Sequence, residues 1–113
     1  MCRNEVYFVS YSIETLLLKF LDLNHKRRAR SDLKGLYQWI VSYENGDTNF
    51  CSKSDYRNAI KRMREYFNIS FKDCLERGII TQESYCRFEE LSQLINSSEE
   101  IYDLYCDLKC IEV

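Results

Sequence analysis

The residues with the greatest capacity for chemistry in this sequence are six cysteines and one histidine. The cysteines are at positions 2, 51, 74, 86, 106 and 110, and the histidine is His25. A thiolate beside an imidazole can act as a nucleophile, and four cysteine or histidine ligands can hold zinc. However, no CxxC pair occurs, and His25 is in a basic run with no cysteine near it. We therefore predict no metal site and no cofactor.

Other catalytic arrangements also lack support. With one histidine, general acid–base catalysis would depend on carboxylates, on a cysteine or on His25 alone. The three glycines are isolated, so they cannot form a glycine-rich phosphate loop. We therefore predict that the protein is not an enzyme. A cysteine–histidine pair that meets only in the folded chain is the remaining alternative.

The sequence predicts a cytoplasmic protein with reduced cysteines. No small-residue cleavage site follows an apolar stretch near the N-terminus, so we expect no secretory signal. No apolar run approaches the roughly 20 residues that span a bilayer. In a reducing compartment the cysteines stay free, and those at positions 74, 86 and 106 are expected to pack as small hydrophobic side chains.

Charge is distributed unevenly along the 113 residues, although the net charge is only −2. Residues 1–72 have a balance of +5, and residues 73–113 have a balance of −7. Such a chain can present opposite potentials on two surfaces if the fold keeps the two parts separate. If the parts fold against each other, much of the field cancels, and the sequence leaves both arrangements open.

Two groups of basic residues could contact nucleic acid, because several cations on one surface bind phosphates through counterion release. The groups are Lys26, Arg27, Arg28, Arg30 and Lys34, and Arg57, Lys61 and Arg64. The isoelectric point of about 5.5 and the lack of a recognised nucleic-acid-binding pattern argue against this use. Nucleic-acid binding is therefore the alternative hypothesis, and a solvated basic surface is the simpler one.

Acidic residues in the last third could face a basic surface on a partner protein. The candidate contact residues are Glu83, Glu89, Glu90, Glu99, Glu100, Asp103, Asp107 and Tyr102. Three of the glutamates also fall in predicted first turns, where the helix dipole favours them. Nine tyrosines add stiff contact area with a polar tip, which is typical of protein interfaces. Four of them fall outside the predicted buried stripes: Tyr11, Tyr43, Tyr66 and Tyr102.

Helices must position these residues, because the chain has no proline and its apolar residues recur at helical spacing. Two of the predicted buried stripes are Leu33, Leu36, Tyr37, Ile40 and Val41 in the second helix, and Ile101, Leu104, Tyr105 and Leu108 in the last helix. This pattern predicts an all-α, single-domain bundle of five or six short antiparallel helices over residues 1–113. Residues 5–11 fit a strand or a helix, and Asn4 or Ser12 could begin the first helix. A polar link is predicted over residues 24–31, and the second helix from Ser31 or Asp32 to the turn at 44–47.

The remaining helix boundaries follow capping residues. Ser52 with Asp55 predicts a capping box for the third helix, and a separate short helix is predicted from Ser70 to Leu75, before Gly78. Thr81 is predicted to cap the next helix. Ser97 with Glu100 predicts a capping box for the last helix.

Two stretches have similarities to known helical proteins. Ser12-Ile13-Glu14, Phe20-Leu21, Arg27-Arg28 and residues 36–44, followed by the capped helix from Ser54, resemble the helical immunity proteins that neutralise tRNA-cleaving colicins. This similarity covers about half of the chain and lies in hydrophobic spacing. Residues 75–83 resemble a turn in helical partners of small nucleotidyltransferases. Neither similarity assigns the chain to a family.

The sequence therefore predicts a small binding protein that masks a partner protein with a basic surface through its acidic, tyrosine-containing helices. Its expected type is an immunity protein or a phage anti-defence inhibitor. The first alternative is a helical nucleic-acid-associated protein that uses residues 26–34 and 57–64. A homodimer is a further alternative, and no membrane partner is expected.

Overall fold

The computed structural model describes residues 3–21, 23–47 and 52–111. Within these ranges the chain forms five α-helices and no β-strand. The helices are α1 (Arg3–Phe20), α2 (Leu23–Glu44), α3 (Lys53–Glu76), α4 (Gln82–Gln93) and α5 (Ser98–Lys109). The predicted all-α fold class is confirmed.

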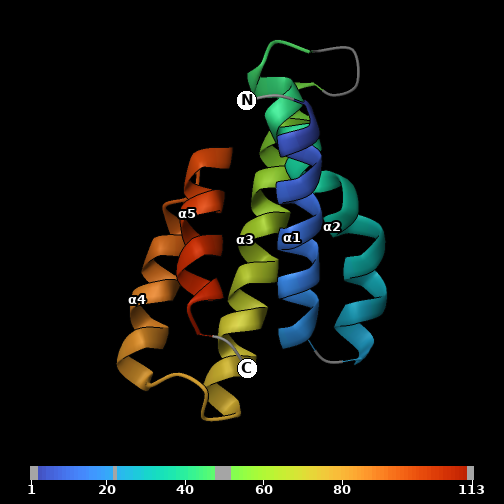
Figure 1. The fold of residues 1–113 in the computed structure, drawn as a ribbon. Helices are drawn as coiled ribbons and strands as arrows, with labels where there is room; N and C mark the ends of the chain where they lie inside the picture. Colours follow the sequence, from blue (N-terminus) through green and yellow to red (C-terminus); the bar gives the residue numbers. More distant parts are fainter. Residues whose placement is uncertain (1–2, 22, 48–51, 112–113) are drawn as a thin grey trace.

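Each helix runs opposite to the one before it, so α1, α3 and α5 share one direction (Figure 1). The long helix α3 packs against α1, α2 and α4, whereas α5 packs mainly against α4 and α2. In Figure 1, α1 and α5 lie on either side of α3, and they do not pack closely against each other.

The core is a single cluster of apolar side chains that recur at helical spacing on each helix. The predicted stripe of α2 is fully confirmed, because Leu33, Leu36, Tyr37, Ile40 and Val41 are all buried. In α5 the four predicted residues are buried as well: Ile101, Leu104, Tyr105 and Leu108. Trp39, which falls off the α2 stripe, is 51% exposed.

Residues 5–11, for which the sequence left strand and helix open, are helical. Neither Asn4 nor Ser12 begins this helix, because α1 already includes Arg3. The predicted polar link over residues 24–31 is wrong, because these residues belong to α2, which begins at Leu23 and contains Ser31 and Asp32 in its interior. Its basic side chains are compatible with a helix, because lysine and arginine have high helix propensity and Ala29 supplies a fully buried position between them.

The predicted short helix from Ser70 is the second half of α3. Ser70 does not begin a helix there, because its hydroxyl donates a hydrogen bond to the carbonyl oxygen of Tyr66, 2.8 Å away in the same helix. The end of α3 is as predicted, since Gly78 follows the cap residue Arg77 with a φ of 74°. Gly46 ends the turn after α2 with a φ of 90°. Only glycine adopts such angles at low cost.

Of the caps predicted for α3, α4 and α5, those of α3 and α4 are confirmed. Ser52 and Asp55 form a complete capping box at α3, and Thr81 accepts the backbone N–H of Ser84 at α4. Ser97 precedes α5 but makes no side-chain cap hydrogen bond to that helix. Its hydroxyl instead donates to the Glu100 carboxylate, which also accepts the backbone N–H of Asn96.

The cysteines and tyrosines also correct the sequence predictions. Cys74 is buried as expected, but Cys86 and Cys106 are exposed on the surfaces of α4 and α5. Cys2 and Cys51 lie outside the described residues. Tyr66, predicted to lie outside the buried stripes, is only 5% exposed. Among the described helices, none combines the length and the apolar character needed to cross a membrane.

Candidate functional site

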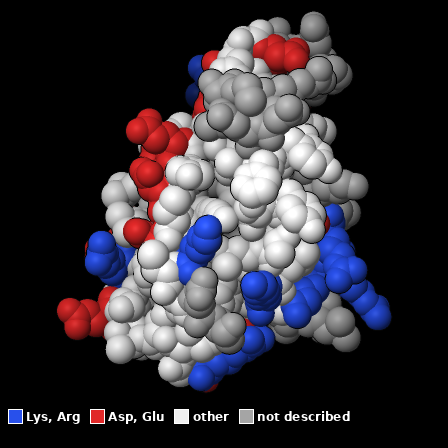
Figure 2. All heavy atoms as spheres, viewed as in Figure 1, with Lys and Arg blue, Asp and Glu red and all other residues white. Residues whose placement is uncertain are grey.

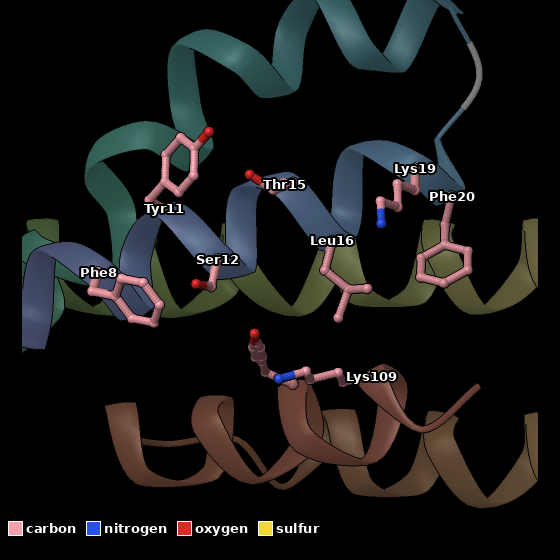
Figure 3. A pocket seen from close by; sticks show the side chains of 9 residues that line it. Phe8, Tyr11, Ser12, Thr15, Leu16, Lys19, Phe20 and Lys109 are labelled. Atoms are coloured by element: carbon pink, nitrogen blue, oxygen red, sulfur yellow. The ribbon is translucent and has the colours of Figure 1, made fainter. Parts of the chain in front are cut away.

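An open and mainly apolar groove lies between α1 and α5, with a volume of about 520 Å³. In Figure 3, Phe8, Ser12, Leu16 and Phe20 extend from α1 toward α5, and Lys109 lies on the α5 side. These α1 residues recur every four positions, so a single helix face lines the groove. The full lining comprises Phe8, Tyr11, Ser12, Thr15, Leu16, Lys19, Phe20, Tyr105 and Lys109.

Three aromatic side chains of α1 lie largely outside the core. Tyr7, Phe8 and Tyr11 are 61%, 69% and 60% exposed. Tyr11 lies four residues after Tyr7 and three after Phe8, so it is a neighbour of both on the surface of α1. A cluster of large exposed aromatics beside a groove is typical of a binding surface, whereas single exposed aromatics are ordinary.

Not all of the predicted acidic residues are available on the surface. Glu89 is partly buried, and both carboxylate oxygens of Glu100 accept hydrogen bonds before the first turn of α5. The others are exposed: Glu83, Glu90, Glu99, Asp103 and Asp107. Glu99, Asp103 and Asp107 recur every four residues and form an acidic row along α5.

Tyr102 belongs to the same exposed side of α5 and is 42% exposed. A hydrogen bond with Cys106 and the negative charge of Asp103 both raise the pKa of Tyr102. Its ring also meets Tyr105 edge-on, with 6.0 Å between the ring centroids. The Tyr102 hydroxyl is therefore protonated at neutral pH, and its side chain lies beside the acidic row.

Charges are only partly separated on the face shown in Figure 2. Acidic side chains lie mainly over α4 and α5, but basic side chains lie there too, in the lower part of the face and over α2. The charge balance of the two parts of the sequence therefore does not become two surfaces of opposite sign on this face.

The predicted basic residues do not share one site. Arg28 lines a cleft between α2 and α3, together with His25 and Arg62. Arg57 and Arg64 line a second cleft near the beginning of α3. Of the other predicted residues, Arg27, Arg30 and Lys61 are exposed and Lys26 is partly buried. The side chain of Lys34 lies outside the described part of the structure.

The first of these clefts is organised by Asp32 of α2. One carboxylate oxygen accepts the Tyr66 hydroxyl at 2.6 Å, and the other pairs with Arg62 at 3.2 Å. Burial and this hydrogen bond raise the pKa of Tyr66. The cleft has a volume of about 520 Å³ and also contains Glu65. Its two carboxylates offset the positive charge of its arginines.

A second carboxylate of α2, Glu44, joins three helices. It accepts the Tyr56 hydroxyl of α3 at 2.8 Å. It also accepts the backbone N–H of Ser98 at 2.9 Å and the Ser98 hydroxyl at 2.6 Å. Glu44 thus supplies the cap for α5 that Ser97 does not provide, and its negative charge favours that helix N-terminus.

Cys74 is buried, and burial raises the pKa of its thiol to about 11, so it is protonated at neutral pH. Within the described residues, no three His, Cys, Asp or Glu side chains come together in a way that could hold a metal ion. The groove between α1 and α5 contains no carboxylate or histidine among its lining residues.

Sequence reasoning missed the groove and both carboxylate junctions. The signal for the exposed aromatics was the helical spacing of Tyr7, Phe8 and Tyr11, which is obscured if residues 5–11 are considered as a strand. No local signal identifies Glu44 as the cap of α5, because its partner Ser98 is 54 residues away.

Comparisons of the chain with protein-family models, with curated proteins and with solved structures gave no match.

Proposed function

We propose that this protein is a small non-enzymatic binding protein that acts by covering a site on a partner protein. The observation that carries the proposal is the exposure of Tyr7, Phe8 and Tyr11 beside the groove between α1 and α5. Aromatic side chains supply large buried areas at low conformational cost and are enriched at the energetic centres of interfaces.

The proposed partner is a protein with a basic surface and an apolar projection. The projection would fill the groove, whose volume lies within the range of typical binding pockets. Basic side chains around it would face Glu99, Asp103 and Asp107 on α5. Such complementarity accelerates association and selects the orientation of the partner.

The mode of action would be inhibition by masking, as in the immunity proteins that part of the sequence resembles. The partner's basic site would lie under the acidic row, and the aromatic surface of α1 would provide most of the affinity. This division of roles follows from general behaviour: exposed charges mainly affect association rates, and buried aromatic groups mainly affect dissociation rates.

Affinity capture from the lysate of the source cell, followed by mass spectrometry, tests the proposal with four matched baits. They are the unmodified protein, the variant Tyr7→Ser/Phe8→Ser/Tyr11→Ser, the variant Glu99→Gln/Asp103→Asn/Asp107→Asn, and the control Arg27→Gln/Arg30→Gln. We expect one protein to be retained by the unmodified bait and the control and depleted on both other variants. Equal retention by all four baits would contradict the proposal.

With the partner purified, the association rate constant gives a second test. The acidic row predicts that this rate falls as salt concentration rises, with a weaker salt dependence in the triple amide variant. An association rate that does not change with salt would show that the acidic row has no role in recognition.

A further inference from the structure

A second site, independent of the groove, lies at the beginning of α3. It is a cavity of about 230 Å³ lined by the end of α2, the first half of α3 and the connection between α4 and α5. The lining residues are Tyr43, Lys53, Tyr56, Arg57, Ile60, Arg64 and Asn96. All three elements meet at the same end of the bundle (Figure 1).

Three cations converge on this cavity. Lys53, Arg57 and Arg64 lie on one side of α3, because their spacings of four and seven residues bring them into line on a helix. Within the described part of the chain, none of the three forms an ion pair. The Nε atom of Arg64 is buried and has no hydrogen-bond acceptor. Buried donors almost always have partners in native structures, so a water or a bound anion is expected to accept this N–H.

The carboxylates nearby are already engaged elsewhere. Glu44 accepts hydrogen bonds from Tyr56 and Ser98, and Glu100 accepts them from Asn96 and Ser97. Both acids therefore order the cavity wall and form no ion pair with its arginines, although their negative charges remain close to Tyr56 of the lining. The Arg62 side chain on the same helix shows the contrasting case, because Asp32 pairs with it directly.

We propose that this cavity binds the phosphate group of a small phosphomonoester. A terminal phosphate carries nearly two negative charges at neutral pH and three acceptor oxygens, which match three converging cations. The cavity is smaller than a typical pocket for a drug-sized ligand, which favours a compact anionic group. The ring of Tyr43, stacked on Tyr56 with 4.6 Å between centroids, and the side chain of Ile60 provide an apolar wall for the attached organic part.

Isothermal titration calorimetry at constant ionic strength, with inorganic phosphate and adenosine monophosphate as probes, tests the proposal. We expect saturable binding of both probes by the unmodified protein, weakened about tenfold or more by Arg64→Gln. The control variant Arg62→Gln, which alters an arginine of the other cleft, should bind both probes as the unmodified protein does. Binding should strengthen as the pH rises through about 6, where the phosphate acquires its second charge.

Two further arms keep the test decisive. Lys53 and Arg57 are exposed, so Lys53→Gln/Arg57→Gln will fold even if Arg64→Gln does not, and it should also weaken binding. A single-stranded oligonucleotide without a terminal phosphate is the third probe. Absence of saturable binding to phosphate and adenosine monophosphate would overturn the proposal. Tighter binding of the oligonucleotide than of adenosine monophosphate would also overturn it, in favour of a nucleic-acid backbone.

Discussion

Two tyrosines of α3 bond to two carboxylates of α2, yet the two junctions have different consequences. At one, Asp32 accepts Tyr66 and also neutralises Arg62. At the other, Glu44 accepts Tyr56 and caps α5 through Ser98, so it leaves the nearby arginines unpaired. The tyrosine–carboxylate pair is the same at both junctions, but a nearby arginine is ion-paired at one and not at the other. The difference comes from the further group that each carboxylate binds, which is Arg62 for Asp32 and Ser98 for Glu44.

The largest expected effect is a loss of stability at alkaline pH. This effect allows the roles of Tyr66 and Tyr56 to be compared directly. Burial and a carboxylate hydrogen bond raise the pKa of both Tyr66 and Tyr56, and burial raises that of Cys74 to about 11. These groups stay protonated in the folded state while the unfolded chain loses its protons. The contribution of these groups to the free energy of unfolding is therefore fully present below about pH 9 and is lost as the pH rises. Cys74 alone accounts for a loss of about 2 to 3 kcal/mol at most.

Urea unfolding followed by circular dichroism at several pH values measures this effect. Tyr66 is more deeply buried than Tyr56, so Tyr66→Phe should flatten the alkaline part of the profile more than Tyr56→Phe. If both variants keep the slope of the unmodified protein above about pH 10, neither junction controls the alkaline transition.

Substitution Asp32→Ala comes next in magnitude. It leaves the buried Tyr66 hydroxyl without its acceptor, and we expect the free energy of unfolding to fall by about 2 kcal/mol. The Arg62 pair should contribute little, because its side chain is more than half exposed. Urea denaturation of Asp32→Ala, Tyr66→Phe and the double variant separates the two terms. A fully additive double variant would mean that the hydrogen bond does not couple these residues.

The smallest expected effect is that of Glu44→Ala. Loss of the α5 cap and of an exposed tyrosine hydrogen bond should cost about 1 kcal/mol. The signature is local: hydrogen exchange should accelerate at the first-turn amides of α5 and stay unchanged at the beginning of α4, which Thr81 caps. Glu44→Gln, which retains an acceptor, is the matched control. Uniform acceleration throughout the protein would mean that Glu44 acts on global stability only.

Local signals in the sequence determine most of the fold. Apolar spacing identified the buried residues of α2 and α5, and Gly46 and Gly78 marked real helix ends because their backbone angles require glycine. The errors arose where two helical stretches continue without interruption. A serine such as Ser70 resembles a cap in sequence, but its hydroxyl can bond back to its own helix, and only the structure distinguishes the two.

The sites were less predictable than the fold, because they depend on pairings between distant residues. The sequence presents Arg57, Arg62 and Arg64 as equivalent cations on one helix. The fold pairs Arg62 with Asp32 and directs the other two into a separate cavity. Similarly, Glu100 looks like a surface acid in the sequence but is engaged by Asn96 and Ser97. A count of charged residues shows how many cationic and anionic side chains the protein has. Only the folded structure shows which of them form ion pairs and which remain accessible.

The outward position of Trp39 on α2 has a spectroscopic consequence. Because this indole is the only one in the chain and is half accessible to water in the folded protein, denaturation will change its emission wavelength little. The same accessibility makes it sensitive to soluble quenchers such as iodide. Fluorescence quenching will thus report when another molecule covers the outer side of α2, while remaining largely indifferent to occupancy of the groove beside α1.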